Sequence, residues 1–280
     1  MKNWILILGL MASFHANAAI IAEGDDCGDN CHWQIDDETH TLSIAGIGKM
    51  KNYNTQSVEG RGILSAAPWF EYDDKINTVT VGEGMTSIGN NAFRAMHLEN
   101  VNLPEGLEEI GYGAFMTHSL KHIDLPSSLT KIKDIAFQDA PLEDIELPSN
   151  LQSIGWGAFA NTKISSIILP ETVKSLNAYA FGDDTTLNGY YKHTPLQSLY
   201  CPEHFMTQCE NAVAFRANLG QATDIFSYQT TPNGQIFYNN KWYNNANDIL
   251  TGNYIQKRIY TIEEANQVSG KVNRVSIRYK

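Results

Sequence analysis

The chain has 280 residues, with 20 basic and 31 acidic side chains and a formal net charge of -11. Charged residues make up 18% and hydrophobic residues 42%, which argues against disorder over most of the chain, because disorder needs high charge and few apolar residues. The acidic balance also excludes a strongly basic nucleic-acid-binding protein. The length allows one long domain or two short ones, with a sizeable buried core.

Residues 1–18 are typical of a secretory signal peptide. Lys2 precedes the apolar run Trp4–Met11, and Ala16-Asn17-Ala18 has the small-x-small pattern of a cleavage site. The run is shorter than the about 20 apolar residues that span a bilayer. The alternative is a buried N-terminal helix. We therefore expect an exported protein that is secreted, attached to the cell surface or periplasmic, with no transmembrane segment.

The four cysteines form two pairs that are close in the sequence, Cys27 with Cys31 and Cys201 with Cys209. In an oxidising compartment such spacing favours local disulfides. His193 and His204 lie near the second pair and leave a zinc site open as an alternative. However, the segment has no C-x-x-C element, and exported thiols tend to oxidise. The prediction is two disulfides and no metal.

Residues 19–75 are predicted to form an N-terminal cap built on a β-hairpin. Trp33-Gln-Ile35 and Leu42-Ser-Ile44 alternate apolar and polar residues around a polar stretch at 36–40. Such a hairpin would cover the apolar edge of the segment that follows. Residues 54–66 are polar and contain glycine, so we expect a loop there.

Residues 76–202 contain a repeat of 22 residues. Ala-Phe recurs at this spacing at positions 92–93, 114–115, 136–137, 158–159 and 180–181. Leu-Pro recurs in register at 103–104, 125–126, 147–148 and 169–170. A sixth, diverged copy follows an insertion and contains Leu196, Leu199 and Cys201-Pro202.

One repeat has too few apolar groups to bury a core alone, so the copies must stack and align identical columns. The alternation Val101-x-Leu103 predicts a short strand, which Pro104 ends by removing a hydrogen-bond donor. The Ile-Gly-x-x-Ala-Phe half is expected to turn the corner, with Phe filling the interior. The prediction is a curved solenoid with six short parallel strands; an uncurved β-solenoid is the alternative.

One full repeat reads Leu98-x-x-Val101-x-Leu103-Pro104-x-x-Leu107-x-x-Ile110-Gly111-x-x-Ala114-Phe115. This unit resembles the BspA-like, treponemal-type class of bacterial leucine-rich repeats. Residues 27–33, 42–44 and Ala67-Pro68-Trp69 are similar to the N-terminal region of that family. The resemblance implies an α+β leucine-rich repeat solenoid wound as a right-handed superhelix. It also implies a surface or secreted protein of the kind implicated in adhesion and protein binding.

The C-terminal part is predicted to contain a cap and a separate module. Residues 203–225 have the composition of a capping helix, with Gly220 placed to stop it. Residues 226–280 hold seven basic and three acidic residues, a charge of +4, and six of the 13 tyrosines. We expect a small basic α+β module with a hairpin at 236–243, a helix at 261–270 and a strand at 275–279.

The sequence carries no motif that indicates catalysis. A phosphate-binding loop, a G-x-S-x-G elbow and an H-E-x-x-H pair are all missing, so we predict a non-enzymatic protein without a cofactor. Acidic doublets at 25–26, 36–37, 73–74 and 183–184 are interpreted as solvated turns. A calcium site at Asp25, Asp26, Asp29 and Asn30 is conceivable but lacks EF-hand spacing.

The candidate site is the outward side of the predicted strands, which is the concave face of the solenoid. Stacking brings the outward residues of neighbouring repeats together. His122, Asp124, Asp144 and Glu146 would then form one patch, here called the acidic patch. Three repelling carboxylates favour a cationic partner; the alternative is a face that is polar only to be solvated. The candidate ligand-binding residues are Asn100, Asn102, His122, Asp124, Asp144, Glu146, Ile168 and Tyr200.

Two functional hypotheses follow. In the first, the chain is a non-enzymatic adhesion or binding protein whose concave face engages a protein or glycan, such as host extracellular matrix or cell-envelope material. In the second, the repeats are a structural spacer, and the basic C-terminal module docks on an anionic envelope or partner.

Overall fold

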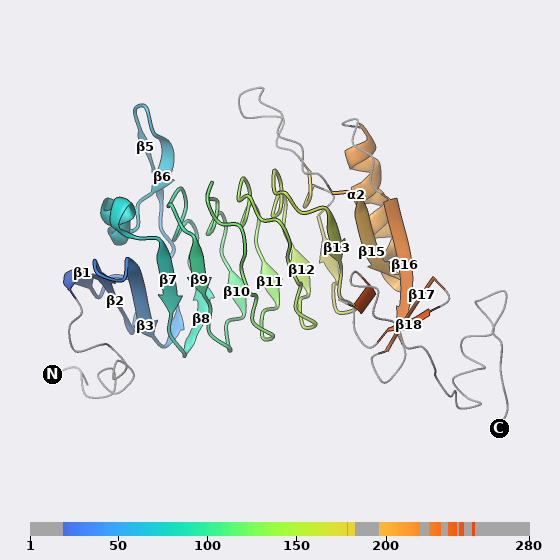
Figure 1. Cartoon of the computed structure of the whole chain (residues 1–280), viewed down its shortest axis with the longest axis horizontal. Helices are drawn as coiled ribbons and strands as arrows, with labels where there is room; N and C mark the ends of the chain where they lie inside the picture. The colour runs from blue at the N-terminus through green and yellow to red at the C-terminus, as the bar shows by residue number, and fades with distance from the viewer. Residues whose placement is uncertain are drawn as a thin grey trace.

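The computed structural model describes residues 19–177, 179–182, 196–218, 224–230, 235–239, 241–243 and 248–249. In this part of the chain short strands stack along one long axis (Figure 1). The predicted signal peptide, the predicted helix at 261–270 and the predicted strand at 275–279 lie outside the described residues. No helix in the described part is long and apolar enough to cross a membrane.

The N-terminal sheet joins the predicted hairpin to the first repeats. Its strands, in spatial order, are β1 (Ile20–Gly24), β2 (Cys31–Asp36), β3 (Thr41–Gly46), β7 (Thr78–Val81) and β9 (Asn100–Asn102). β2 and β3 pair antiparallel, and β3 then pairs parallel with β7, which places Leu42 opposite Val79. Trp33, Ile35 and Ile44 are buried in this arrangement. The apolar residues of the alternating pattern thus form the face of the hairpin that packs against the repeats.

A second, fully parallel sheet runs beside the first. Its strands, in spatial order, are β4 (Gly48–Lys49), β8 (Met85–Ile88), β10 (Glu109–Ile110), β11 (Lys131–Ile132), β12 (Ser153–Ile154) and β14 (Ser175–Leu176). From β8 onward each isoleucine or leucine pairs with the one 22 residues further along, as in Ile110 with Ile132. The sequence predicted only a corner here. All of these strands except β8 are two residues long, which is too short to show alternation, and this is why the pattern missed the sheet.

The C-terminal sheet combines the last repeats with the start of the predicted module. Its strands, in spatial order, are β13 (Ser166–Ile168), β15 (Ser198–Pro202), β16 (Asp224–Thr230), β17 (Ile236–Tyr238) and β18 (Lys241–Tyr243). β13, β15 and β16 are parallel, whereas β17 and β18 form an antiparallel hairpin that turns at Asn239, which has a φ of 47°. The predicted boundary at residue 226 therefore falls inside β16, which continues the stack.

Two expectations about strands are wrong. The structure has no strand at 122–124 or 144–146, so the predicted sheet of six strands is interrupted between β9 and β13. Acidic residues gather at this interruption, and like charges on facing strands oppose pairing. Residues 54–66 are a hairpin instead of a loop, made of β5 (Thr55–Val58) and β6 (Gly62–Ser65). Gly60 and Gly62 supply the positive φ that its turn needs.

Three helical elements are described in full, and residues 248–249 are helical as well. The 3-10 helix η1 (Pro68–Lys75) precedes the repeats, and η2 (Glu203–Phe205) leads directly into α2 (Met206–Asn218). The last two cover the segment for which the sequence predicts a helix. In Figure 1 α2 lies at the end of the stack, beside β15 and β16, and the β5–β6 hairpin projects away from the stack at the other end.

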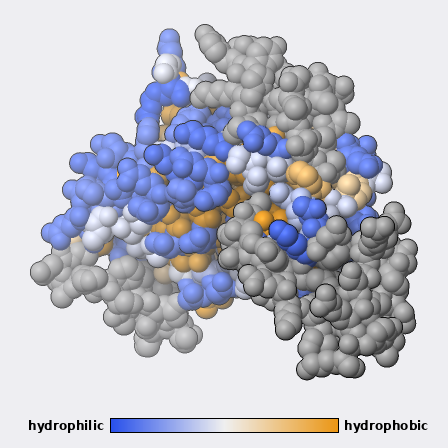
Figure 2. Space-filling view, turned by 45° about the vertical axis from the view of Figure 1, so that its right-hand side comes forward, coloured by the Kyte–Doolittle hydropathy of each residue, from blue (hydrophilic) through white to orange (hydrophobic). Residues whose placement is uncertain are grey.

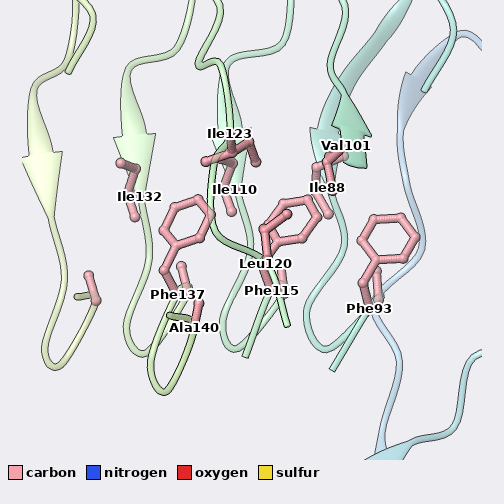
Figure 3. Close-up of a cluster of buried hydrophobic side chains, with 14 of the residues drawn as sticks. Ile88, Phe93, Val101, Ile110, Phe115, Leu120, Ile123, Ile132, Phe137 and Ala140 are labelled. Atoms are coloured by element: carbon pink, nitrogen blue, oxygen red, sulfur yellow. The ribbon is translucent and has the colours of Figure 1, made fainter. Parts of the chain in front are cut away.

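A ladder of stacked aromatic rings runs through the interior. Trp69 begins it, and the repeated phenylalanines continue it with centroid separations between 5.2 and 6.1 Å. Figure 3 shows Phe93, Phe115 and Phe137 beside the aligned side chains of Ile88, Ile110 and Ile132. Hydrophilic residues cover much of the outside, with hydrophobic residues visible between them (Figure 2). Identical columns in register thus give one continuous core.

Both pairs of cysteines are disulfide-bonded, Cys27 to Cys31 and Cys201 to Cys209. These thiols are therefore not available as zinc ligands, and His193 lies outside the described residues. Across the described ranges, no group of three or more His, Cys, Asp or Glu side chains is arranged to hold a metal ion.

Candidate functional site

Six of the eight candidate residues lie on the solvent side of the first sheet and its interruption. They are all exposed: Asn100, Asn102, His122, Asp124, Asp144 and Glu146. Asn102 donates its amide to the hydroxyl of Thr80 at 3.1 Å, one repeat away. The 22-residue stacking therefore aligns these side chains in columns, as the repeat predicts.

The acidic patch is centred on the interruption between β9 and β13. His122 Nδ1 lies 2.9 Å from Asp144 Oδ1, with side-chain exposures of 63% and 80%. Such an exposed pair contributes little to stability. Among the described residues no lysine or arginine forms an ion pair with Asp124, Asp144 or Glu146. His122 thus contacts one of the three carboxylates, and the patch carries net negative charge in solvent.

The expectation that Ile168 is an exposed binding residue is wrong. Ile168 is only 8% exposed and packs in a cluster of buried residues with Tyr228, Ile236, Tyr243 and Ile249. The C-terminal strands cover the outer side of β13, and an apolar side chain at position 168 is therefore buried and not exposed to solvent.

Tyr200 is partly covered in the same way. Its ring stacks on Phe226 at 5.0 Å and meets Tyr238 edge-on at 5.3 Å. The hydroxyl of Tyr228 donates to the carbonyl of Leu169, which ties β16 to the last repeats. The open part of the candidate site therefore ends at the acidic patch.

Two phenols of this C-terminal cluster, the buried Tyr228 and the partly buried Tyr238, hold their protons tightly. Burial, followed by the neighbouring Tyr200 and Tyr243, raises the pKa of Tyr238 to about 12. Burial also raises the pKa of Tyr228, with the charge of Glu171 adding to the effect. These groups stay neutral at physiological pH and act in packing, not in proton transfer.

The sequence did not single out a groove on the outer side of β11, β12 and β14. Its volume is about 670 Å³. Lys131 and Lys133 on one side both reach Glu109, at 3.7 and 2.6 Å. Polar residues that alternate with the buried isoleucines line this groove. That alternation is the feature of the sequence from which the groove could have been predicted. The remaining lining residues are Tyr112, Ile132, Asp134, Ser153, Ile154, Gly155, Ser175, Leu176 and Asn177.

The acidic doublets that were interpreted as solvated turns differ from one another. Asp25 lies 2.8 Å from His32 Nδ1, and Asp26 accepts a hydrogen bond from Trp33 Nε1 at 2.7 Å. Asp73 is buried and accepts bonds from both the backbone and the ring of His97, each at 2.8 Å. The interpretation as solvated carboxylates is therefore wrong for Asp73, which fastens the end of η1 to the first repeats.

The stacked units, with a Leu/Ile core and short parallel strands, define a leucine-rich repeat protein. Residues 67–188 match the BspA type leucine rich repeat region in six copies, so the repeat region of this chain is similar to that family. Proteins of this family are generally non-enzymatic and are typically surface-associated binding or adhesion proteins.

Solved structures of bacterial proteins resemble this chain. A leucine-rich repeat protein from Eubacterium ventriosum ATCC 27560 superposes with a TM-score of 0.52 at 23% identity. The match covers 78% of this chain and 49% of that protein, so this chain spans about half its length. At this identity the likeness shows the fold alone.

Two further structures match with lower TM-scores. A leucine rich cell surface protein from Faecalibacterium prausnitzii A2-165 has a TM-score of 0.35 and 15% identity over 77% of this chain and 60% of that one. The pneumococcal vaccine antigen PcpA has a TM-score of 0.39 and 17% identity over 80% and 55%. No curated protein matches this chain in sequence.

Proposed function

We propose that this chain is an exported, non-enzymatic binding protein whose concave face engages a cationic region of a protein or glycan. The observation that carries the proposal is the acidic patch. Three carboxylates from two adjacent repeats are exposed, and in the described part of the chain the one ion-pair contact among them is that of His122 with Asp144. A surface that serves only solubility has no need to concentrate one sign of charge at a single place.

The finer features of the fold belong to the same proposal. We infer that the repeats wind as a right-handed superhelix, that the β2–β3 hairpin and α2 cap its ends, and that residues 1–18 direct export. Terminal caps with polar outer faces keep repeat stacks soluble.

The test removes charge from the acidic patch without changing shape. Asp124→Asn, Asp144→Asn and Glu146→Gln are combined in one variant, and retention on immobilised extracellular-matrix protein and on cell-envelope material is measured at two salt concentrations. We expect weaker retention by the variant, and weaker retention of the wild type at high salt. Exposed charges are screened beyond roughly 8 Å at physiological ionic strength.

A matched control separates the patch from overall charge. Glu59, Glu83 and Glu108 are exposed and lie outside the patch, and changing all three to Gln alters the net charge by the same amount. Equal losses in both triple variants would contradict a specific site. Retention lost only when Lys257, Arg258, Arg274 and Arg278 are neutralised would favour the spacer with a basic docking module instead.

A further inference from the structure

The groove on the outer side of β11, β12 and β14 shares no residue with the acidic patch. Its volume is about 670 Å³, which is within the range of pockets that hold small ligands. The three strands are neighbours in the second sheet and belong to three successive repeats. A ligand that fills the groove would therefore contact three repeats at once.

Small residues make the hollow. Ser153 and Ser175 occupy the column that holds Lys131 in the repeat before them. Two positions later in the repeat, Gly155 follows Lys133 in the same way. Because the sheet accepts a lysine in the first of these columns, stacking alone does not require the two serines. The change from long to short side chains between β11 and β12 is a feature of these particular repeats.

The charges at the groove cancel. Lys131 Nζ and Lys133 Nζ lie 3.7 and 2.6 Å from the carboxylate oxygens of Glu109. Asp134 also lines the groove, so two positive and two negative side chains give these four residues a net charge of zero. A site for an ion would carry an excess of the opposite charge. The groove therefore fits a neutral ligand.

Polar side-chain atoms at the groove are held in place and have spare hydrogen-bonding capacity. Asp134 Oδ1 accepts the backbone N–H of Trp156 at 2.8 Å, and Asn177 Oδ1 accepts that of Tyr179 at 3.1 Å. Within the described part of the chain, Asp134 Oδ2, Asn177 Nδ2 and the hydroxyls of the two groove serines have no hydrogen-bond partner. An acceptor, a donor and two hydroxyls are groups that can pair with the hydroxyls of a sugar.

Aromatic rings lie at the groove as well. Tyr112 lines it and is 43% exposed. Trp156 directly follows Gly155, and its ring lies 6.3 Å from that of Tyr179, which is 41% exposed. An aromatic ring is a flat apolar surface, and a sugar ring has an apolar face of C–H groups between its hydroxyls. Rings beside hydroxyl and amide groups therefore match a carbohydrate in both respects.

We propose that this groove binds a neutral oligosaccharide, with Tyr112 contacting the C–H face of a sugar unit and Ser153, Ser175 and Asn177 bonding to its hydroxyls. The acidic patch selects a cation, whereas this groove selects an uncharged ligand. Binding here should therefore be insensitive to salt and unchanged in the triple variant of the acidic patch. Failure of the proposed function at the acidic patch leaves this site standing.

The direct test titrates the full chain with a set of neutral hexasaccharides: cellohexaose, maltohexaose, mannohexaose and N-acetylchitohexaose. Heat of binding is measured by calorimetry at low and high salt. We expect saturable binding of at least one of these probes, with the same affinity at both salt concentrations. Failure of the whole set to bind at millimolar concentration overturns the proposal. Binding of polygalacturonate alone, or an affinity that falls with salt, overturns the assignment to a neutral ligand.

A matched pair of serine variants tests whether the binding is in the groove. Ser175→Gln fills the hollow with a neutral side chain, in a column that already holds Lys131. Ser165→Gln is the control, because Ser165 is also exposed, lies outside the groove and shares its column with Lys121. We expect the affinity for the bound hexasaccharide to fall at least roughly tenfold in Ser175→Gln and to stay unchanged in Ser165→Gln. Equal affinities in the two variants would refute the site.

Discussion

The phenylalanine ladder shows how a single residue type holds this molecule together. Phe137 is fully buried, and its ring stacks on Phe115 at 5.6 Å and on Phe159 at 5.5 Å, with the planes within 8° of parallel. The parallel arrangement follows from translation by one repeat, because each ring inherits the orientation of the ring before it. Every interior ring therefore stabilises two neighbouring repeats.

Phe137→Ala should lower the free energy of unfolding by about 3–5 kcal/mol, because it removes a large buried side chain from a position that cannot collapse. Urea denaturation monitored by circular dichroism measures this change. Lys121→Ala, an exposed substitution in the same repeat, serves as the control and should change stability by no more than about 0.5 kcal/mol. A loss as small as that of the control would place Phe137 outside the core.

At single positions the sequence predicted which side chains are buried but not where the backbone is left-handed. Ile135 has a φ of 49°, in the same column as Asn91 at 54° and Gly113 and Gly157 at 58° and 60°. A β-branched residue is strained in this region. The sequence pattern does not predict this left-handed conformation, because an isoleucine indicates only an apolar position. The conformation follows from stacking, since the residues in the same column of the neighbouring repeats have the same positive φ. By contrast, the tight corner predicted at Gly111 is present, since a Cβ there would lie 2.7 Å from the carbonyl oxygen of Ile88.

At the scale of elements, the C-terminal strands show that the pattern of one repeat predicts which side of a strand a residue lies on, but not whether that side is exposed to solvent. The outward position of Ile168 follows correctly from the strand period, and its burial follows from β16 to β18, which lie far along the chain. Nothing in the local pattern tells a free face from one that is covered by a distant segment. The second sheet was missed for a related reason, because its strands are defined by pairing between repeats and not by alternation within one repeat.

The same cluster should make the C-terminal strands sensitive to alkali. The pKa of Tyr238 rises from 10.0 to about 12 on folding, so above pH 10 the unfolded chain loses a proton that the folded chain keeps. The unfolded state then binds fewer protons, and the free energy of unfolding falls as pH rises from about 10 to about 12; below pH 10 this contribution is constant. A series of denaturant melts across this range, with phenolate absorbance recorded in parallel, measures the loss. Tyr238→Phe should flatten part of the slope, and an unchanged slope would show that Tyr238 is not the responsible group.

On the scale of the whole molecule, the cross-links lie at the ends and the stack holds the middle. Cys27–Cys31 and Cys201–Cys209 close short loops with separations of 4 and 8 residues, and between them the described repeats are held by the two sheets and the aromatic ladder. Sequence periodicity predicted this linear organisation because each repeat contacts only its neighbours. It did not predict the break in the first sheet at the acidic patch, which depends on charges that face each other only after stacking.

Removing one disulfide should therefore loosen one end and leave the other untouched. The double variants Cys27→Ala/Cys31→Ala and Cys201→Ala/Cys209→Ala each remove one short loop, for which the loop-entropy estimate is about 2–3 kcal/mol. Because coupling passes only between neighbours, hydrogen–deuterium exchange should increase over β1 to β3 in the first variant and over β15, α2 and β16 in the second. Peptides around Phe115 and Phe137 should keep their protection in both, and each variant is the other's control. A uniform rise along the chain in either variant would mean that the stack unfolds as one cooperative unit, and that nearest-neighbour contacts do not set its local stability.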